Sequence, residues 1–235
     1  MNVHDSVALV TGGNRGLGDR FVRALLENGA RKVYAAARDP RRVTAEGAVP
    51  IALDVTDPDS VRAAARQAQD VTVLINNAGS NTGASVMEGD FADFRREYET
   101  HVLGTLGVTR EFAPVLARNG GGQVLNVLSV LSWHTFPGAA AYSAAKSAAW
   151  SVTNALRLAL RPQGTTVSAL HVGYMDTDMT RMLDVPKTDP ADIARIALKA
   201  LEEGREEIIA DEVSRQIKTG LSGDLELLYP QLASR

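Results

Sequence analysis

Residues 7–18 read VALVTGGNRGLG, an apolar run that passes directly into a glycine-rich turn. The run has the length of a buried strand, and the amphipathic stretch 16–27 that follows has the length of a helix. Glycine allows a tight turn and a close approach of the backbone to a ligand. A helix that begins behind such a turn offers free N–H groups and a favourable dipole to phosphate. The segment therefore predicts the opening strand, phosphate-binding turn and helix of an α/β sheet; an ordinary tight turn is the alternative.

Six further apolar, β-branched runs repeat this order along the chain. The seven predicted strands are 7–10, 32–36, 49–53, 71–75, 122–128, 166–172 and 207–210. The amphipathic stretches that predict helices are 16–27, 58–68, 91–117, 141–160 and 190–203. Such alternation is typical of βαβ units, whose crossovers are right-handed. We predict a doubly wound, mostly parallel seven-stranded sheet with helices on both faces, a Rossmann-like α/β fold that binds ligands beyond the carboxyl ends of its strands.

The length of 235 residues is compatible with one domain, 1–235, built around a single sheet. A hydrophobic content of 45% and a charged content of 23% are typical of a soluble globular protein. After the seventh run the chain is charged and leucine-bearing, so 211–235 is predicted to be a C-terminal packing tail. This tail packs either on its own domain or on a partner subunit.

The charge and the cysteine content exclude several classes of function. A net charge of −3 with scattered basic residues predicts no basic surface that would bind nucleic acid or an anionic membrane. The absence of cysteine excludes disulfides, thiolate catalysis and cysteine-bound zinc. The four histidines show no metal-ligand spacing, so we predict no catalytic metal. No apolar run is long enough to span a bilayer and the N-terminus does not resemble a signal peptide, which predicts a cytoplasmic protein.

Two motifs follow the first and fourth predicted strands. Gly12, Gly16 and Gly18 give the first turn the spacing G-x-x-x-G-x-G, and the fourth run ends in Asn-Asn-Ala-Gly at 76–79. With this pairing the chain resembles the short-chain dehydrogenase/reductase family, from residue 7 to about residue 211. The resemblance implies a nicotinamide dinucleotide as cofactor. It places these residues of the two motifs in the cofactor site: Gly12, Asn14, Arg15, Gly16, Leu17, Gly18, Asn77, Ala78 and Gly79.

Two further strand ends match cofactor positions of the family. Asp54 and Val55 match the position that touches the adenine ring, although Asp54 could equally cap the helix that begins near Pro58. Gly173 and Thr177 lie in a turn that resembles the family's Pro-Gly-x-x-x-Thr, with valine in place of the proline. The resemblance makes this turn part of the cofactor site and Thr177 the contact to the nicotinamide carboxamide.

The end of the second predicted strand governs which dinucleotide is bound. An acidic residue there binds the ribose diol of NAD, whereas an arginine receives the 2′-phosphate of NADP. Ala37 occupies the acidic position, and Arg38 follows it with a planar fork that suits phosphate. Arg15 adds a second cation on the same side. We therefore predict NADP rather than NAD; the alternative for Arg38 is a surface ion pair with Asp39.

The reacting groups are predicted from a second set of positions. Tyr142 and Lys146 are four residues apart in an alanine-rich helix, so they share one face. A cation beside a phenol favours the phenolate, so Lys146 is expected to lower the pKa of Tyr142 from about 10. Ser129, at the end of the fifth strand, matches the catalytic serine of the family. The resemblance implies that Tyr142 exchanges a proton with a carbonyl or alcohol oxygen, Ser129 holds that oxygen, and Lys146 also binds the nicotinamide ribose.

His101 departs from the family pattern, which has asparagine at this position. In the family the asparagine holds a water that links the lysine to solvent. A histidine can donate and accept, and it titrates near neutral pH. We therefore propose that His101 replaces the asparagine in the proton relay. The alternative is a buried helix histidine that is satisfied by a backbone carbonyl.

The segments near the reacting groups predict a small-molecule substrate that is mainly apolar, although their apolar side chains could instead be core filler. These side chains are Trp133, His134, Phe136, Met175, Met179, Met182 and Leu183. The resemblance implies a homodimer or homotetramer assembled through the helices 91–117 and 141–160. The predicted function is thus hydride transfer between nicotinamide and a carbonyl or alcohol. The alternative is a catalytically weak NADP-binding sensor or interaction protein on the same fold.

Overall fold

Seven strands form one sheet in the computed structural model, which describes residues 3–233. Residues 1–2 and 234–235, the ends of the predicted domain and tail, lie outside the described residues. The strands are β1 (Val7–Thr11), β2 (Lys32–Ala37), β3 (Val49–Ala52), β4 (Val73–Asn76), β5 (Gly122–Val127), β6 (Thr165–His171) and β7 (Glu207–Ile209). Their order is β3-β2-β1-β4-β5-β6-β7, and every pairing is parallel. The predicted doubly wound sheet is confirmed, with its switch point between β1 and β4.

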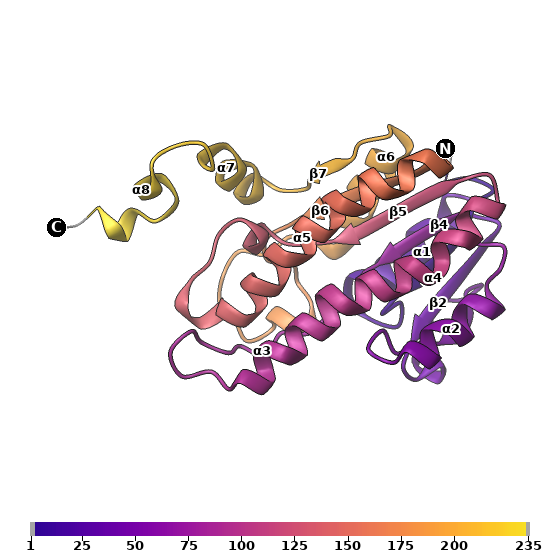
Figure 1. Cartoon of the computed structure of the whole chain (residues 1–235), viewed down its shortest axis with the longest axis horizontal. Helices are drawn as coiled ribbons and strands as arrows, with labels where there is room; N and C mark the ends of the chain where they lie inside the picture. Colours follow the sequence, from indigo (N-terminus) through magenta and orange to yellow (C-terminus); the bar gives the residue numbers. More distant parts are fainter. Residues whose placement is uncertain (1–2, 234–235) are drawn as a thin grey trace.

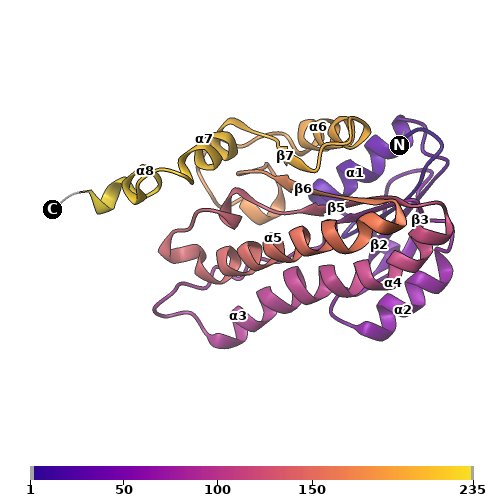
Figure 2. The same ribbon diagram turned by 45° about the horizontal axis from the view of Figure 1, so that its top comes forward.

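Helices cover both faces of the sheet, as Figure 2 shows. The covering helices are α1 (Gly16–Glu27) and α6 (Pro190–Glu202) on one face and α2 (Pro58–Gln67), α4 (Thr105–Arg118) and α5 (Ala140–Leu160) on the other. Successive strand residues point to opposite faces, so Ala8 and Val10 pack beneath α1 and α6 whereas Val7 and Leu9 pack beneath α2, α4 and α5. Both faces are buried, which explains why the strands read as continuous apolar runs.

The predicted helix over 91–117 is interrupted in the structure. It divides into α3 (Phe91–Tyr98), a π-helical turn (Glu99–Gly104) and α4. The widened turn carries His101, and buried polar side chains on this stretch bond to the segment 80–82 instead of packing against apolar neighbours. Single π-helical turns inside longer helices are frequent at functional sites. Hydrophobic periodicity alone does not reveal such a turn, because the apolar pattern on either side remains helical.

The C-terminal tail extends beyond the carboxyl ends of the strands as α7 (Glu212–Gly220) and α8 (Leu225–Leu228), at the upper left of Figure 1. It contacts the loop that follows β5. The His134 ring nitrogen Nε2 lies 3.0 Å from the Leu228 carbonyl oxygen, and the Thr135 N–H donates to the Tyr229 hydroxyl over 3.2 Å. The tail therefore packs on its own chain at this loop.

Residues 3–233 contain neither a candidate membrane span nor a candidate metal cluster. No helix in this part of the chain combines the length and the apolar character needed to cross a membrane. No three or more histidine, aspartate or glutamate side chains of the same residues come together as they would around a metal ion.

Candidate active site

The glycine turn after β1 has the shape that a phosphate-binding turn needs. Gly12 and Gly16 adopt positive φ angles of 65° and 53°, which side-chain-bearing residues rarely adopt. A Cβ at Gly18 would overlap the Gly12 carbonyl, so only glycine lets α1 start this close to β1. No side chain caps α1 at Arg15, so the first N–H groups of the helix face the turn. These backbone features fit the pyrophosphate of a dinucleotide.

The turn after β4 is bonded directly to the end of β1. The N–H groups of Asn77 and Ala78 both donate to the Thr11 hydroxyl, over 2.9 and 3.0 Å, and the Asn77 side chain donates to the Thr11 carbonyl over 2.9 Å. A Cβ at Gly12 would lie 3.1 Å from the Ala78 Cα. Because β1 and β4 are neighbours at the switch point, two motifs that lie far apart in the sequence form one surface.

The arginine after β2 has no acidic partner. Arg38 is exposed and forms no ion pair or hydrogen bond with any of residues 3–233, since Asp39 pairs with Arg41 over 2.9 Å. The alternative that Arg38 pairs with Asp39 is therefore wrong. Arg15, in the glycine turn, lies 3.7 Å from Asp178 through Nη1 and Oδ2. Arg38 is thus a guanidinium beside the turn that is available for an anion.

The alternative role of Asp54 as a helix cap is also wrong. Its carboxylate accepts from the N–H and the hydroxyl of Thr56, over 3.0 and 2.7 Å. Asp57 caps α2 instead, by accepting from the Asp59 N–H. Asp54 and the half-buried Val55 remain at the end of β3 beside the β2 terminus, where the adenine position was predicted.

The turn after β6 lies beside the glycine turn. A Cβ at Gly16 would approach the Thr177 methyl group to 3.6 Å. Thr177 begins a 3-10 turn (Asp178–Thr180), and the Gly173 N–H donates to the Asp211 carboxylate over 2.6 Å. The structure thus brings Thr177 next to the turn after β1.

Ser129, Tyr142 and Lys146 converge at the carboxyl ends of β5 and β6. The Ser129 hydroxyl accepts from the Leu131 N–H over 3.1 Å and lies 3.4 Å from the Val172 carbonyl oxygen. The Lys146 ammonium donates to the Val127 carbonyl over 2.8 Å and lies 5.5 Å from the Tyr142 ring centroid. Ser129 and Lys146 are buried, and Tyr142 is partly exposed.

The electrostatics of this trio differ from the prediction. Burial raises the pKa of Tyr142, and the neighbouring Ser129 hydroxyl opposes the rise only in part. Burial also lowers the pKa of Lys146 to about 7, against the charge of Glu97, so the ammonium is only partly charged at neutral pH. The predicted lowering of the Tyr142 pKa by Lys146 is therefore wrong in direction, because desolvation of the phenol is the largest cause of the shift and Lys146 does not contribute to it.

His101 lies against Tyr142 and is paired with a carboxylate that sequence reasoning missed. The two rings meet edge to face with centroids 5.2 Å apart. The His101 nitrogen Nε2 lies 2.9 Å from the Ser80 carbonyl oxygen and 3.1 Å from Glu97 Oε2. Glu97 is fully buried and also accepts from the Ser80 hydroxyl and the Thr82 N–H, over 2.9 and 2.5 Å. The four-residue spacing of Glu97 and His101 on one helical face was the available signal.

The pKa values of this pair shift in the same direction for different reasons. Burial would raise the pKa of Glu97, but the hydrogen bonds it accepts outweigh burial and lower it. Burial and the charge of Lys146 lower the pKa of His101, against the effect of Glu97. The contact with the Ser80 carbonyl agrees with the structural alternative for His101, and the contact with Tyr142 places the same ring at the reacting end.

The side chains that were predicted to line an apolar pocket do not share one environment. Trp133 is buried against His171 and Trp150 instead of being exposed to a pocket. Phe136, Met179, Met182 and Leu183 are exposed on the segments that flank the reacting end.

Comparison with known proteins agrees with this arrangement. A family model described as short chain dehydrogenase matches residues 6–187. The chain belongs to the short-chain dehydrogenase/reductase family. It is therefore an oxidoreductase by family, and the motifs described above are those of its dinucleotide-binding fold.

Several relatives align with most of the length of this chain. A short chain dehydrogenase from Burkholderia cenocepacia, solved in complex with NADP, is 38% identical with a TM-score of 0.94, and the match covers 100% of both chains. A 3-ketoacyl-(acyl-carrier-protein) reductase from Brucella melitensis, complexed with NADH, is 26% identical with a TM-score of 0.80 over 88% of this chain and 97% of that one. A 3-oxoacyl-(acyl-carrier-protein) reductase of Vibrio cholerae is 28% identical over 78% of this chain and 79% of its own length.

Proposed function

We propose that this family member is an NADP-dependent oxidoreductase that transfers a hydride between nicotinamide and a carbonyl or secondary alcohol. The observation that carries the proposal is the convergence of Ser129, Tyr142 and Lys146 at the carboxyl ends of β5 and β6. The glycine turn and the Asn77 turn lie at the adjacent switch point, where a doubly wound sheet binds its ligands.

The preference for NADP over NAD rests on the end of β2. Ala37 leaves no carboxylate to hold a ribose diol, and Arg38 has no acidic partner among the described residues. A free guanidinium matches a 2′-phosphate in shape and charge. The relative from Burkholderia cenocepacia binds NADP, whereas the more distant one from Brucella melitensis binds NADH. Arg38 is therefore the residue that we assign to the 2′-phosphate, with Arg15 beside it.

The remaining cofactor residues follow from the same arrangement. Gly12 to Gly18 and the N–H groups of α1 would hold the pyrophosphate. Asp54 and Val55 would flank the adenine, and Thr177 and Lys146 would hold the nicotinamide end. Bound NADPH supplies the hydride for reduction of a carbonyl carbon.

Side chains of the protein hold the substrate oxygen and supply its proton. Ser129 holds the carbonyl oxygen through its hydroxyl, which its backbone contacts keep at one position. Tyr142 donates the proton to this oxygen, and its raised pKa keeps the phenol protonated at neutral pH before the reaction. Lys146 then stabilises the phenolate, because a buried ammonium interacts strongly with a nearby negative charge.

His101 is proposed as the next member of the proton path. Its ring lies edge-on to Tyr142 and its Nε2 faces Glu97, so a titratable pair lies beside the phenolate that must take up a proton after each reduction. A pH–rate profile unchanged in His101→Asn would reject this role and leave the structural alternative.

The proposed function is tested by oxidation of NADPH with a panel of ketones and aldehydes. The expected result is turnover of at least one apolar carbonyl by the wild-type protein and none by Tyr142→Phe, which should still bind NADPH. Binding of NADPH without turnover of any carbonyl would contradict the enzyme and favour the sensor on the same fold.

We also propose that the chain assembles as a homodimer or homotetramer through α4 and α5. Leu158 on α5 is 76% exposed, and Leu103 in the π-helical turn before α4 is also exposed, so apolar surface is left on this side. Light scattering of the purified protein should give at least twice the monomer mass. A monomer at all concentrations would reject the assembly.

A further inference from the structure

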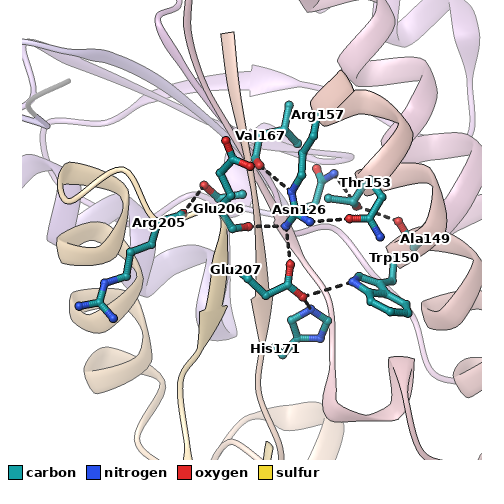
Figure 3. Close-up of polar contacts among 12 residues, drawn as sticks. Asn126, Ala149, Trp150, Thr153, Arg157, Val167, His171, Arg205, Glu206 and Glu207 are labelled. Atoms are coloured by element: carbon teal, nitrogen blue, oxygen red, sulfur yellow. Dashed lines mark hydrogen bonds and ion pairs between the residues drawn. The ribbon is translucent and has the colours of Figure 1, made fainter. Parts of the chain in front are cut away.

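A second buried histidine lies directly behind Ser129. His171 ends β6 and has no exposed surface. Its nitrogen Nδ1 lies 3.2 Å from the Ser129 carbonyl oxygen, and its nitrogen Nε2 lies 2.8 Å from Glu207 Oε1. Figure 3 shows the Glu207 carboxylate above the His171 ring, reached from the neighbouring strand β7. The ring therefore bridges the backbone of Ser129 to a carboxylate.

Both groups that face the ring are acceptors. A backbone carbonyl has no proton to give. Glu207 is held ionised, because its Oε2 lies 2.6 Å from the Arg157 guanidinium and its Oε1 accepts from the Trp150 indole N–H over 3.2 Å (Figure 3). Burial would raise the pKa of Glu207, but its contacts with His171 and Arg157 lower it to about 2. The Nε2 contact with Glu207 is at ion-pair distance, without hydrogen-bond geometry. A ring that faces an acceptor at each nitrogen suits the doubly protonated, cationic form.

The carboxylate itself is fixed in place. Arg157 on α5 also donates to the Val167 carbonyl over 3.0 Å and to the Glu206 carbonyl, so its guanidinium cannot follow Glu207 if that side chain moves. Figure 3 shows these bonds meeting at the Arg157 guanidinium, which also contacts Glu207. With a protonated ring, Arg157, Glu207 and His171 would together carry one net positive charge behind the reacting end.

The other face of the cluster is aromatic. Trp133 stacks on the His171 ring with centroids 3.7 Å apart and planes at 17°, and Trp150 meets Trp133 edge to face. Lys218 of α7 lies over the Trp133 ring, 4.6 Å from its centroid. The charged groups around His171 are therefore Glu207 from β7, Arg157 from α5 and, beyond Trp133, Lys218 from the C-terminal tail.

Ser129 is held from two sides by consecutive residues. The His171 ring contacts the Ser129 carbonyl, while the carbonyl of Val172 lies 3.4 Å from the Ser129 hydroxyl and accepts from the Val130 N–H over 3.0 Å. A shift of the His171 ring would thus move the backbone that sets the direction of the Ser129 hydroxyl. A displacement of a substrate-holding group by about 1 Å can cost about a hundredfold in rate.

We propose that His171 is a positioning residue for Ser129. As an imidazolium paired with Glu207, it fixes the Ser129 backbone and places a buried positive charge behind the substrate oxygen. The role in turnover rests on the proposed function. The protonation state and the bridge to Glu207 do not, so they can be tested separately.

The protonation state is tested by NMR of the histidine side-chain nitrogens at pH 7. In the wild-type protein, the signals that disappear in His171→Phe should report two protonated nitrogens. In Glu207→Gln the same ring should become neutral, whereas Glu206→Gln, which removes only a surface pair with Arg161, should leave it charged. A neutral His171 ring in the wild-type protein would overturn the proposal, whether or not any carbonyl is reduced.

The positioning role is tested with the carbonyl that gives turnover. His171→Phe keeps a ring against Trp133 but removes both donors, and Glu207→Gln keeps the shape but removes the charge. We expect kcat to fall by about tenfold or more in each, with an unchanged Kd for NADPH and with Glu206→Gln at the wild-type rate. Folded variants with wild-type kcat would overturn the positioning role. If no carbonyl is turned over by the wild-type protein, the proposed function fails and the NMR result still decides the bridge. If neither variant folds, the wild-type spectrum remains decisive.

Discussion

Two histidine–glutamate pairs, each with a buried ring, flank the reacting trio, and they differ in how the ring is held. His101 and Glu97 lie on one continuous stretch of helix and π-helical turn, in front of Tyr142. His171 and Glu207 come from neighbouring strands and lie behind Ser129. Around His101 one nitrogen, Nε2, faces the Ser80 carbonyl, the Ser80 N–H and Glu97. Around His171 each nitrogen faces its own acceptor.

The number of acceptors explains the different expected roles. A ring whose two nitrogens face separate acceptors suits the cationic form and a fixed support. A ring whose Nε2 faces a donor as well as two acceptors, and whose pKa is lowered by burial and by Lys146, can change its protonation near the reacting phenol. Glu97 also acts on the pKa values of Tyr142 and Lys146, whereas Glu207 does not contribute to either shift. The front pair therefore influences proton exchange, and the rear pair influences geometry.

The largest effect is expected where the two pairs converge. Tyr142→Phe removes the proton donor that lies against the His101–Glu97 pair. The substrate oxygen that Ser129 holds then has no group to protonate it. We expect kcat for carbonyl reduction to fall by about 10²–10⁴-fold, with NADPH binding retained. Stopped-flow measurement of NADPH oxidation together with a binding titration separates the two. A rate within tenfold of the wild type would mean that neither pair acts through Tyr142.

The rear pair should dominate stability at neutral pH. The pKa of Glu207 is lowered from 4.5 to about 2 in the folded protein. The group therefore stabilises the fold fully above about pH 4.5, by about 3 kcal/mol, and this contribution is lost as the pH falls from 4.5 to 2. Glu207→Gln should lower the free energy of unfolding at pH 7 by about the same amount, because it leaves Arg157 and His171 without their carboxylate.

Urea unfolding of the wild-type protein, Glu207→Gln and Glu206→Gln at several pH values measures this effect. The difference between the wild type and Glu207→Gln should shrink below pH 4.5, while Glu206→Gln should stay close to the wild type at pH 7. An equal loss of stability in both variants would show that the contact between His171 and Glu207 stabilises the fold no more than a surface ion pair does.

A variant at the proposed cofactor site serves as a contrast, because it should leave both histidine–glutamate pairs unaffected. Arg38 lies at the end of β2 and has no contact with either histidine cluster. Arg38→Ala should raise KM for NADPH by about tenfold or more through loss of a charge-assisted hydrogen bond, and leave KM for NADH and kcat unchanged. Steady-state kinetics with both nucleotides checks this. An equal rise for NADH would place Arg38 away from the 2′-phosphate.

The smallest expected effect is a shift of the pH profile. Lys146 has a pKa of about 7, and the charge of Glu97 raises it against the effect of burial. Lys146 is charged below this pKa, so an inflection near pH 7 in kcat/KM for reduction should move to lower pH in Glu97→Gln. It should stay in place in Glu207→Gln. Movement in both variants, or in neither, would remove the distinction between the pairs.

The sequence was sufficient for the sheet, the glycine turn and the trio, because each depends on local order. The glycines at 12, 16 and 18 shape one turn, and Tyr142 and Lys146 share one face of one helix. Parallel strands then bring their carboxyl ends to one edge without further information. The strand ends differ from the prediction by only a few residues.

The polar partners could not be predicted in the same way. Glu207 meets His171 across two strands that are 36 residues apart, and its significance depends on Arg157 from a third element. The direction of the Tyr142 pKa shift depends on burial, which a single helix does not reveal. Glu97 was the exception, because its four-residue spacing from His101 was visible and could have indicated the pair.

The central claim is that Tyr142, Ser129 and Lys146 complete a hydride transfer from NADPH to a carbonyl. The most direct measurement uses NADPH deuterated at the transferring position, a mixture of apolar ketones and aldehydes, and mass spectrometry of the products. We expect deuterium on the carbinol carbon of at least one product with the wild-type protein, and no labelled product with Tyr142→Phe. Tight binding of NADPH with no label in any alcohol, or equal labelling by Tyr142→Phe, would contradict it.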